Sequence, residues 1–325
     1  MPTRKIMDRL NAGDVLLMDG GTGSEIQRRG VDVLKGAEDR LKAWSATANI
    51  DNADVVQQVH QDYLRVGADI IISNNFWTTP NAMERIGLRD RWKDYAKAAA
   101  ENAVKARDAG NPEAYVAGGI AAPTLHARGG TDAPDVTQMG SEAFRDEYVE
   151  HARILAEAGA DVILAEYIGY IADCVAAVDA SAEAGLPVML GVRHIDREGK
   201  MQFGESLADL ASALKGHDVD SVLLMCSNPE AISAGLPIIS DAFEGPVGAY
   251  PNIGYNPTGP LVNRPQLTNQ LPSKGPDILQ IGEYTPTRLA EFAGEWKEMG
   301  AQIIGGCCAT GPEHIMAMRP VVKGS

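Results

Sequence analysis

Three stretches of this sequence share one pattern: Gly67-Ala68-Asp69-Ile70-Ile71-Ile72, Gly159-Ala160-Asp161-Val162-Ile163-Leu164 and Gly300-Ala301-Gln302-Ile303-Ile304. The residues before the first stretch are apolar at helical spacing, as in Val56, Val59 and Tyr63. Each stretch predicts a helix that ends at its glycine, since glycine readily takes the left-handed conformation that stops a helix. The mostly β-branched residues that follow predict a buried strand. Such units at long intervals favour a fold of repeated strand–helix pairs.

Eight short apolar runs predict the strands of such a fold. They occupy residues 15–18, 70–73, 115–118, 162–165, 187–192, 222–225, 246–249 and 303–305. The runs are apolar on both faces, which is typical of parallel strands covered on both sides, and a segment suited to a helix follows each. We predict a single α/β domain over residues 1–325, a (β/α)8 TIM barrel, with an open doubly wound sheet as the alternative. Long connections at roughly 20–52, 120–141 and 252–285 should form the active-site loops.

Composition excludes several classes of protein. The chain has 325 residues and a net charge of −15 at pH 7 without a basic patch, which argues against nucleic acid or an anionic membrane surface as a partner. No apolar segment approaches the length of a membrane helix and the N-terminal residues lack the apolar region of a secretory leader, so we expect a cytoplasmic protein. Cys307 and Cys308 are adjacent and too close for an unstrained disulfide, and Cys174 lies in a helical pattern typical of the core. The cysteines therefore do not form a disulfide framework.

Polar and reactive side chains follow the predicted strands, where the active site of a barrel is expected. In chain order they are Asp19 with Gly20 and Gly21, Phe76 with Trp77, Glu166 with Tyr167, Cys226, Asn252, and Cys307 with Cys308. Cys226 follows the sixth strand and the cysteine pair follows the eighth, only two strands away around a barrel. Gly305-Gly306 allows the backbone to turn so that adjacent thiols can face one ion. Three thiolates favour zinc in an enzyme without redox need; the alternative is a set of buried structural cysteines.

The proposed ligands indicate a type of chemistry. Three thiolates leave a tetrahedral zinc ion with one open position, as in catalytic rather than structural zinc sites. Such an ion activates water poorly, because the thiolates already donate much charge to it. A substrate thiol suits it better, since a free thiol is mostly protonated at neutral pH whereas a metal-bound thiol is deprotonated. The sequence therefore indicates alkyl transfer to a thiol.

Aromatic residues in the first two predicted loops suit a positively charged methyl donor. A thiolate attacks carbon only when the leaving group is good, as in quaternary ammonium or sulfonium compounds, and aromatic faces attract such groups through cation–π interactions. Trp44, Phe76 and Trp77 lie in these loops. The alternative is that their rings only pack beneath a loop.

The segment around the cysteine pair carries a family signature. Gly305-Gly306-Cys307-Cys308 followed by Gly311-Pro312-Glu313-His314-Ile315, with Cys226 upstream, resembles the homocysteine S-methyltransferase family. Asp19-Gly20-Gly21 and Ala165-Glu166-Tyr167 match the family too, and the resemblance runs over nearly the whole chain. Leu10-Asn11-Ala12-Gly13-Asp14 and Arg28-Arg29-Gly30 make the sequence most similar, within the family, to betaine–homocysteine methyltransferases.

The resemblance implies a role for the residues at the strand ends. A (β/α)8 barrel would hold zinc through Cys226, Cys307 and Cys308, with the homocysteine sulfur as the fourth ligand. Asp19 and Glu166, which we expect at neighbouring strand ends, would bind the homocysteine ammonium group through charge-assisted hydrogen bonds.

Further positions have implied roles around the substrate. Backbone amides next to Asp19, at Gly20 and Gly21, would bind the homocysteine carboxylate, and Tyr167 matches a tyrosine that can occupy the open zinc position when substrate is absent. Asn252 resembles a residue near the zinc site, where it orients substrate or makes a turn.

We therefore predict zinc-dependent transfer of a methyl group from a small onium donor to homocysteine, giving methionine. Trp44 and Trp77 match donor-contacting aromatic residues of the betaine enzymes, with Trp77 in place of a tyrosine, so we expect a donor of the glycine betaine, dimethylsulfoniopropionate or S-methylmethionine type. The alternatives are another thiol or selenol acceptor such as selenohomocysteine, a corrinoid-bound methyl group supplied by a partner module, and a non-catalytic zinc or redox-sensing module. The sequence lacks the C-terminal extension that builds tetramers in the betaine enzymes, which leaves open whether it forms a homo-oligomer.

Overall fold

The computed structural model describes residues 2–33, 43–123, 133–253 and 284–324. Its sheet contains eight parallel strands in the order β1-β8-β7-β6-β5-β4-β3-β2. They are β1 (Leu16–Leu17), β2 (Ile70–Ile72), β3 (Tyr115–Ala121), β4 (Val162–Ile168), β5 (Val188–Arg193), β6 (Ser221–Met225), β7 (Val247–Tyr250) and β8 (Ala301–Ile304). A parallel bridge between Met18 and Ile70 joins β1 to β2 and closes the ring. The predicted (β/α)8 barrel and all eight predicted strands are confirmed.

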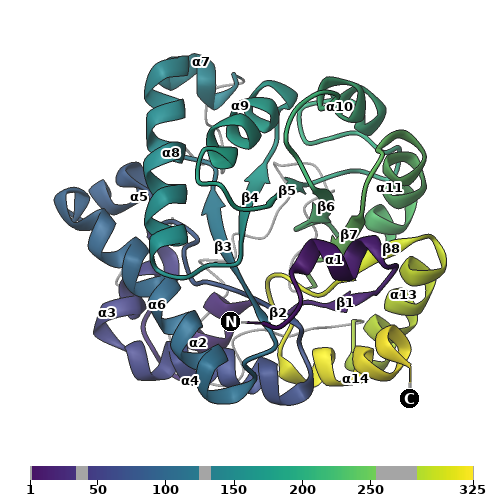
Figure 1. Ribbon diagram of the computed structural model, residues 1–325, viewed down its shortest axis with the longest axis horizontal. Coiled ribbons are helices and arrows are strands. Elements are labelled where there is room, and N and C mark those ends of the chain that lie inside the picture. The colour runs from purple at the N-terminus through teal and green to yellow at the C-terminus, as the bar shows by residue number, and fades with distance from the viewer. Residues whose placement is uncertain (1, 34–42, 124–132, 254–283, 325) are drawn as a thin grey trace.

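Helices surround this ring of strands, as Figure 1 shows. Among the described residues they are α1 (Ile6–Asn11), α2 (Thr22–Arg28), η1 (Trp44–Thr47), α3 (Ala48–Asp51), α4 (Ala53–Val66), α5 (Pro80–Glu84), η2 (Arg89–Arg91), α6 (Trp92–Gly110), α7 (Asp135–Met139), α8 (Ser141–Glu157), α9 (Ile171–Ala182), α10 (Leu207–Ala213), α11 (Pro229–Ala242), α13 (Pro286–Glu298) and α14 (Pro312–Lys323). No helix in these parts of the chain is long and apolar enough to span a membrane.

The repeated glycine turns form as the sequence predicts. Gly67, Gly159 and Gly300 have φ angles of 108°, 99° and 93°, in the left-handed region where a residue with a Cβ is strained. At the first turn, the amide of Ala68 donates to the carbonyl of Tyr63, which satisfies a carbonyl that the ending helix leaves unpaired. Each turn directs the chain from a helix in the outer layer into a strand of the barrel.

Two apolar layers hold the barrel together. Alternate strand residues such as Met18, Leu164 and Ile303 fill its interior, and the residues between them, such as Leu17 and Ile163, pack outward against the helices. Helix α1 lies across the end where the strands begin, since Ile6 and Leu10 join the interior cluster. The opposite end, where the strands finish, is the one that carries the predicted site residues.

The long connections differ from the expected loops. The first contains α2, η1 and α3, because its apolar residues, among them Ile26 and Ala48, are buried against the outer layer of the core. In the second, β3 continues to Ala121 and α7 precedes α8. Most of the third, residues 254–283, lies outside the described residues.

Candidate active site

The three predicted cysteine ligands lie together at the carboxyl end of the barrel. The Sγ atom of Cys307 is 3.4 Å from that of Cys226 and 3.9 Å from that of Cys308, and all three sulfurs lie within 4.8 Å of one another. Cys226 directly follows β6, and the pair lies beyond the end of β8. Among the described residues this is the one group with metal-ligand geometry. Cys174 is fully buried in α9, as predicted for a core residue.

Backbone turns bring the adjacent cysteines to the same side. The amide of Gly306 donates to the carbonyl of Asp19 and the amide of Cys307 to that of Pro251, which ties the segment to neighbouring strand ends. A Cβ on Gly306 would lie 2.2 Å from the side chain of Thr310, so only glycine fits there. The glycine pair thus provides the predicted turn.

The three sulfurs fit a tetrahedral metal ion. Ligands about 2.3 Å from a tetrahedral zinc ion lie about 3.8 Å from one another. The sulfur–sulfur distances of 3.4 and 3.9 Å are close to that value.

Without a cation the three thiols cannot all ionise. Hydrogen bonds from Cys226 and then Cys307 lower the pKa of Cys308 well below the usual thiol range. The corresponding hydrogen bonds with Cys226 and Cys308, together with burial, raise the pKa of Cys307 well above it. Ionisation of one thiol therefore disfavours ionisation of its neighbours, and a bound cation is needed to stabilise three thiolates side by side.

Two buried carboxyl groups lie in the same end of the barrel. Asp19 is fully buried, and its Oδ2 accepts a hydrogen bond of 2.9 Å from the amide of Ile72 while its Oδ1 has no partner. Burial raises the pKa of Asp19 well above its usual value, and the charge of Glu166 raises it further. Burial likewise raises the pKa of Glu166 to about 8, although Tyr250 donates a 3.4 Å hydrogen bond to it. This pair is suited to a cationic group that would compensate both charges.

The two carboxyl groups do not come from neighbouring strands, contrary to the sequence-based expectation. β2 and β3 separate β1, which precedes Asp19, from β4, which contains Glu166. They interact because both lie at the same end of the barrel, where the charge of Glu166 raises the pKa of Asp19.

The glycines after Asp19 let two chain segments approach closely. A Cβ on Gly20 would lie 2.2 Å from the carbonyl oxygen of Thr310, and the amide of Gly21 donates to the same carbonyl. The Gly21 amide is therefore already engaged, so it is not free for the substrate carboxylate that the family resemblance assigns to it. The role of Gly20 stays a prediction.

The three predicted aromatic residues gather beside Tyr167. The rings of Phe76 and Trp77 stack with centroids 5.2 Å apart, and Phe76 meets the ring of Tyr167 edge-on at 5.1 Å. Trp44 packs against the same cluster, and Trp77 is only 4% exposed. We refer to Trp44, Phe76, Trp77 and Tyr167 as the aromatic cluster. The rings pack together, and Tyr167 links them to the apolar cluster of the barrel interior, which also contains Cys226.

Backbone strain concentrates at these same positions. Among the described residues other than glycine, those with positive φ are Trp44, Trp77, Tyr167, His194, Cys226 and Ala309. His194 and Cys226 directly follow strands and Tyr167 lies near the end of β4, and side chains with a Cβ avoid this conformation unless the surroundings enforce it. Strain of this kind is typical of functional sites, and no sequence pattern could have located it.

Hydrogen bonds orient several side chains around the cysteines. The hydroxyl of Tyr167 lies 3.2 Å from Nε2 of His194, whose Nδ1 lies 2.9 Å from Oε1 of Gln202. Because the amide oxygen of Gln202 can only accept, His194 carries its proton on Nδ1, and Tyr167 donates to Nε2. Asn252 donates from Nδ2 to the sulfur of Cys226 at 3.6 Å, so its side chain contacts a proposed metal ligand.

Three residues near the site were not assigned a role from the sequence. Met225 ends one apolar run and Tyr250 directly follows another, and the Tyr250 hydroxyl contacts both the Met225 sulfur at 3.1 Å and Glu166. Arg193, at the end of β5, is buried, and its guanidinium lies 4.5 Å from the centre of the Tyr167 ring. Inward-facing positions of β5, β6 and β7 would have been the signal for all three.

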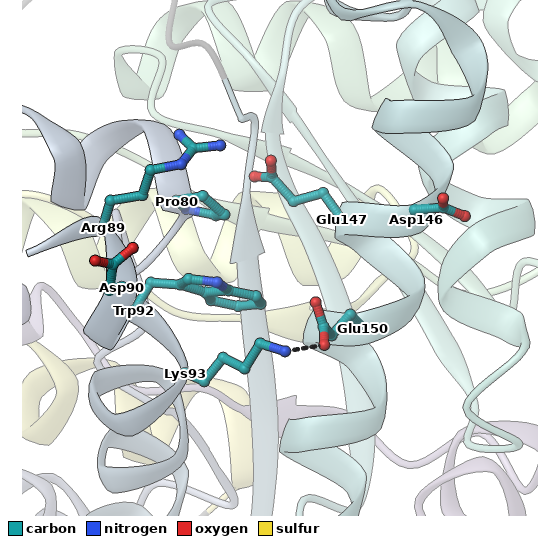
Figure 2. A pocket seen from close by; sticks show the side chains of 8 residues that line it. All are labelled: Pro80, Arg89, Asp90, Trp92, Lys93, Asp146, Glu147 and Glu150. Carbon is teal, nitrogen blue, oxygen red and sulfur yellow. Dashed lines mark hydrogen bonds and ion pairs between the residues drawn. The ribbon is translucent and has the colours of Figure 1, made fainter.

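A separate pocket lies in the outer helical layer (Figure 2). It has a volume of 410 Å³ and is lined by Pro80, Arg89, Asp90, Trp92, Lys93, Asp146, Glu147 and Glu150. Lys93 forms an ion pair with Glu150 across it. Glu147 has a buried Oε1 without a hydrogen-bond partner, and burial raises its pKa to about 7. None of the predicted site residues lines this pocket.

Glu147→Gln is expected to stabilise the protein at high pH only. The folded protein disfavours the charged carboxylate, so the free energy of unfolding falls as the pH rises from 4.5 towards 7 and stays lower above it. We expect the variant to raise the melting temperature by roughly 2–4 °C at pH 8.5 and not at pH 4.5. Glu150→Gln, which removes an exposed, ion-paired carboxylate, is the control. An equal shift at both pH values would show that the effect is not electrostatic.

Known proteins resemble this chain along nearly its full length. The family model described as Homocysteine S-methyltransferase matches residues 16–322. Homocysteine S-methyltransferase from Escherichia coli (strain K12) is 27% identical over 326 residues, covering 98% of this chain and 97% of the relative. Homocysteine S-methyltransferase 1 from Zea mays is 27% identical and covers 96% of each chain. The crystal structure of the homocysteine methyltransferase MmuM from Escherichia coli, in its metallated form, superposes with a TM-score of 0.73 at 24% identity, covering 96% of this chain and 98% of that one. This structural similarity supports the barrel fold.

Proposed function

Because this chain belongs to the homocysteine S-methyltransferase family, we propose that it transfers a methyl group from a small onium compound to homocysteine at a zinc ion held by Cys226, Cys307 and Cys308. Family membership makes the chain a methyltransferase that acts on homocysteine, and it argues against a non-catalytic zinc or redox-sensing module. The zinc ion, the donor class and the residue roles are the proposal. The observation that carries it is the trio of cysteine sulfurs within 4.8 Å of one another, next to two buried carboxyl groups.

The cysteines and carboxyl groups would act on homocysteine together. Bound zinc would supply the deprotonation of the substrate thiol at neutral pH. Asp19 and Glu166 would bind the substrate ammonium group, since a cation restores the ionised form that burial disfavours in both. Two contacts to the same amino acid, one at each end, would fix the direction of the sulfur lone pair towards the donor.

The aromatic cluster would hold the donor on the other side of the substrate sulfur. Aromatic faces attract an onium group and exclude water from it. In the reaction, a new sulfur–carbon bond forms while the bond from the methyl carbon to the onium nitrogen or sulfur breaks. The electron pair of the broken bond stays on the onium nitrogen or sulfur and neutralises its positive charge, and the proton of the thiol passes to solvent. A dry aromatic surface favours this loss of charge in the donor.

Methionine formation from homocysteine with a panel of donors tests this proposal. We expect zinc-loaded protein to consume homocysteine with at least one of glycine betaine, dimethylsulfoniopropionate and S-methylmethionine. Selenohomocysteine serves as an alternative acceptor and methylcobalamin as an alternative donor in the same assay. Turnover with methylcobalamin alone, or with no acceptor other than the selenol, would contradict the proposed reaction.

A further inference from the structure

Arg193 is a buried cation that forms no ion pair with any described residue. It is 1% exposed, and its Nε and Nη1 atoms are buried with no hydrogen-bond partner. No carboxylate in the described parts of the chain forms an ion pair with it. Its guanidinium lies over the face of the Tyr167 ring, 4.5 Å from the ring centre.

Such an arrangement differs from that of a structural arginine. Arginine stays charged in proteins and carries five N–H donors, so burying it without acceptors is costly. Arg107 of this chain, which is 3% exposed, shows the usual solution: it forms ion pairs of 2.9 Å with Asp161 and 2.8 Å with Asp108. The ring of Tyr167 interacts with the face of the Arg193 guanidinium, and the Nε and Nη1 groups at its edge remain without a hydrogen-bond partner.

The location of Arg193 indicates which group would satisfy it. Tyr167 is part of the aromatic cluster, which we propose binds the donor, and its ring also meets Phe76. A fixed positive charge beside this cluster repels a donor that is only a cation. The same charge attracts a donor that carries a carboxylate in addition to its onium group. A carboxylate has two acceptor oxygens in the geometry that a guanidinium fork matches.

We propose that Arg193 binds a carboxylate of the methyl donor, and that the enzyme therefore selects onium carboxylates over simple onium cations. This inference rests on the proposed function, since it assumes that an onium donor occupies the space beside the aromatic cluster. It assigns to Arg193 the specificity for the charge of the donor, separate from the chemistry at the cysteines.

Arg193→Gln tests the proposal with pairs of donors that differ in the carboxylate. Dimethylsulfoniopropionate is paired with ethyldimethylsulfonium, and glycine betaine with ethyltrimethylammonium. For the carboxylate-bearing member, we expect kcat/KM to fall about 100-fold, as when one partner of a buried charge pair is lost. For the simple cation we expect no loss or a gain, because a repelling charge has been removed. The KM for homocysteine should stay unchanged.

Controls separate a binding role from a structural one. Arg197→Gln, an exposed arginine four residues away, should leave all values unchanged. Arg193→Lys keeps the positive charge but loses the paired N–H donors of the guanidinium, so we expect kcat/KM to fall about 10-fold for the carboxylate donor only. This variant also replaces Arg193→Gln in the test if the glutamine variant does not fold. An equal fall in kcat/KM for both donors of a pair would overturn the proposal. A rise in the KM for homocysteine with unchanged kcat/KM for the donors would overturn it too.

A binding measurement keeps the inference separate from the proposed function. Titration of the tryptophan fluorescence of Trp44 and Trp77 with each donor reports binding without turnover. If the wild-type protein transfers no methyl group but binds onium carboxylates in an Arg193-dependent way, the reaction is wrong and the carboxylate site stands. If donors bind equally well with and without a carboxylate, the Arg193 inference fails whether or not the protein is active.

Discussion

Replacing Cys307 by alanine is expected to remove the metal ion and to slow methyl transfer by on the order of 10,000-fold. The substitution takes away the sulfur that lies closest to both other sulfurs, 3.4 Å from Cys226 and 3.9 Å from Cys308. Thiol activation and thiol positioning are lost together, and each contributes factors of about 100 or more to a rate. Metal content by elemental analysis and methionine formation, measured on the same preparation, check both effects.

Cys174→Ala is the matched control for this variant. It removes a thiol of the same type from a fully buried position in α9, away from the three-sulfur cluster. We expect the control to lose some stability, because a buried side chain is shortened, while it keeps its metal and its activity. Full activity in Cys307→Ala would refute the assignment of the cysteines.

Glu166→Gln is expected to lower kcat/KM for homocysteine about 100-fold, chiefly through KM. The carboxylate is proposed to compensate the substrate ammonium group in a buried site, where a lost ion-pair partner has a large effect. Folding should not suffer. Because the pKa of Glu166 is raised to about 8, the group is mostly neutral at pH 7 in the free protein, and glutamine imitates that neutral form.

The des-amino substrate 4-mercaptobutanoate isolates the ammonium interaction. It keeps the thiol and the carboxylate of homocysteine but carries no positive charge. We expect Glu166→Gln to change kcat/KM for this compound by less than about threefold, because the compound has no ammonium group that could pair with Glu166. Equal losses for homocysteine and 4-mercaptobutanoate would mean that Glu166 shapes the site without contacting the ammonium group.

The barrel was predictable because its signals are local. A glycine that ends a helix, as at Gly67, and a run of apolar residues directly after it, as in β2, occur within a few residues of each other. The position of Cys226 relative to the cysteine pair followed from the strand order alone, because parallel strands of a barrel all end at the same rim.

The inner surface of the site was less predictable because the regular strand pattern breaks there. The register between β4 and β5 shifts between Ala165 and Ile168, and Tyr167 within this interval has a φ of 63°. Alternation along the strand therefore does not tell which way Glu166 and Tyr167 face. Arg193 occupies an inward-facing strand position, but the buried Nε and Nη1 atoms without hydrogen-bond partners, which distinguish it from other such residues, are apparent only in the folded protein.

X-ray absorption at the zinc edge, with and without homocysteine, measures directly which atoms surround the metal. The proposed zinc site predicts one zinc ion per chain with three protein sulfurs at about 2.3 Å, and a fourth sulfur at a similar distance when homocysteine is added. A site with fewer than three protein sulfurs, or a sulfur count that homocysteine does not raise, would contradict it.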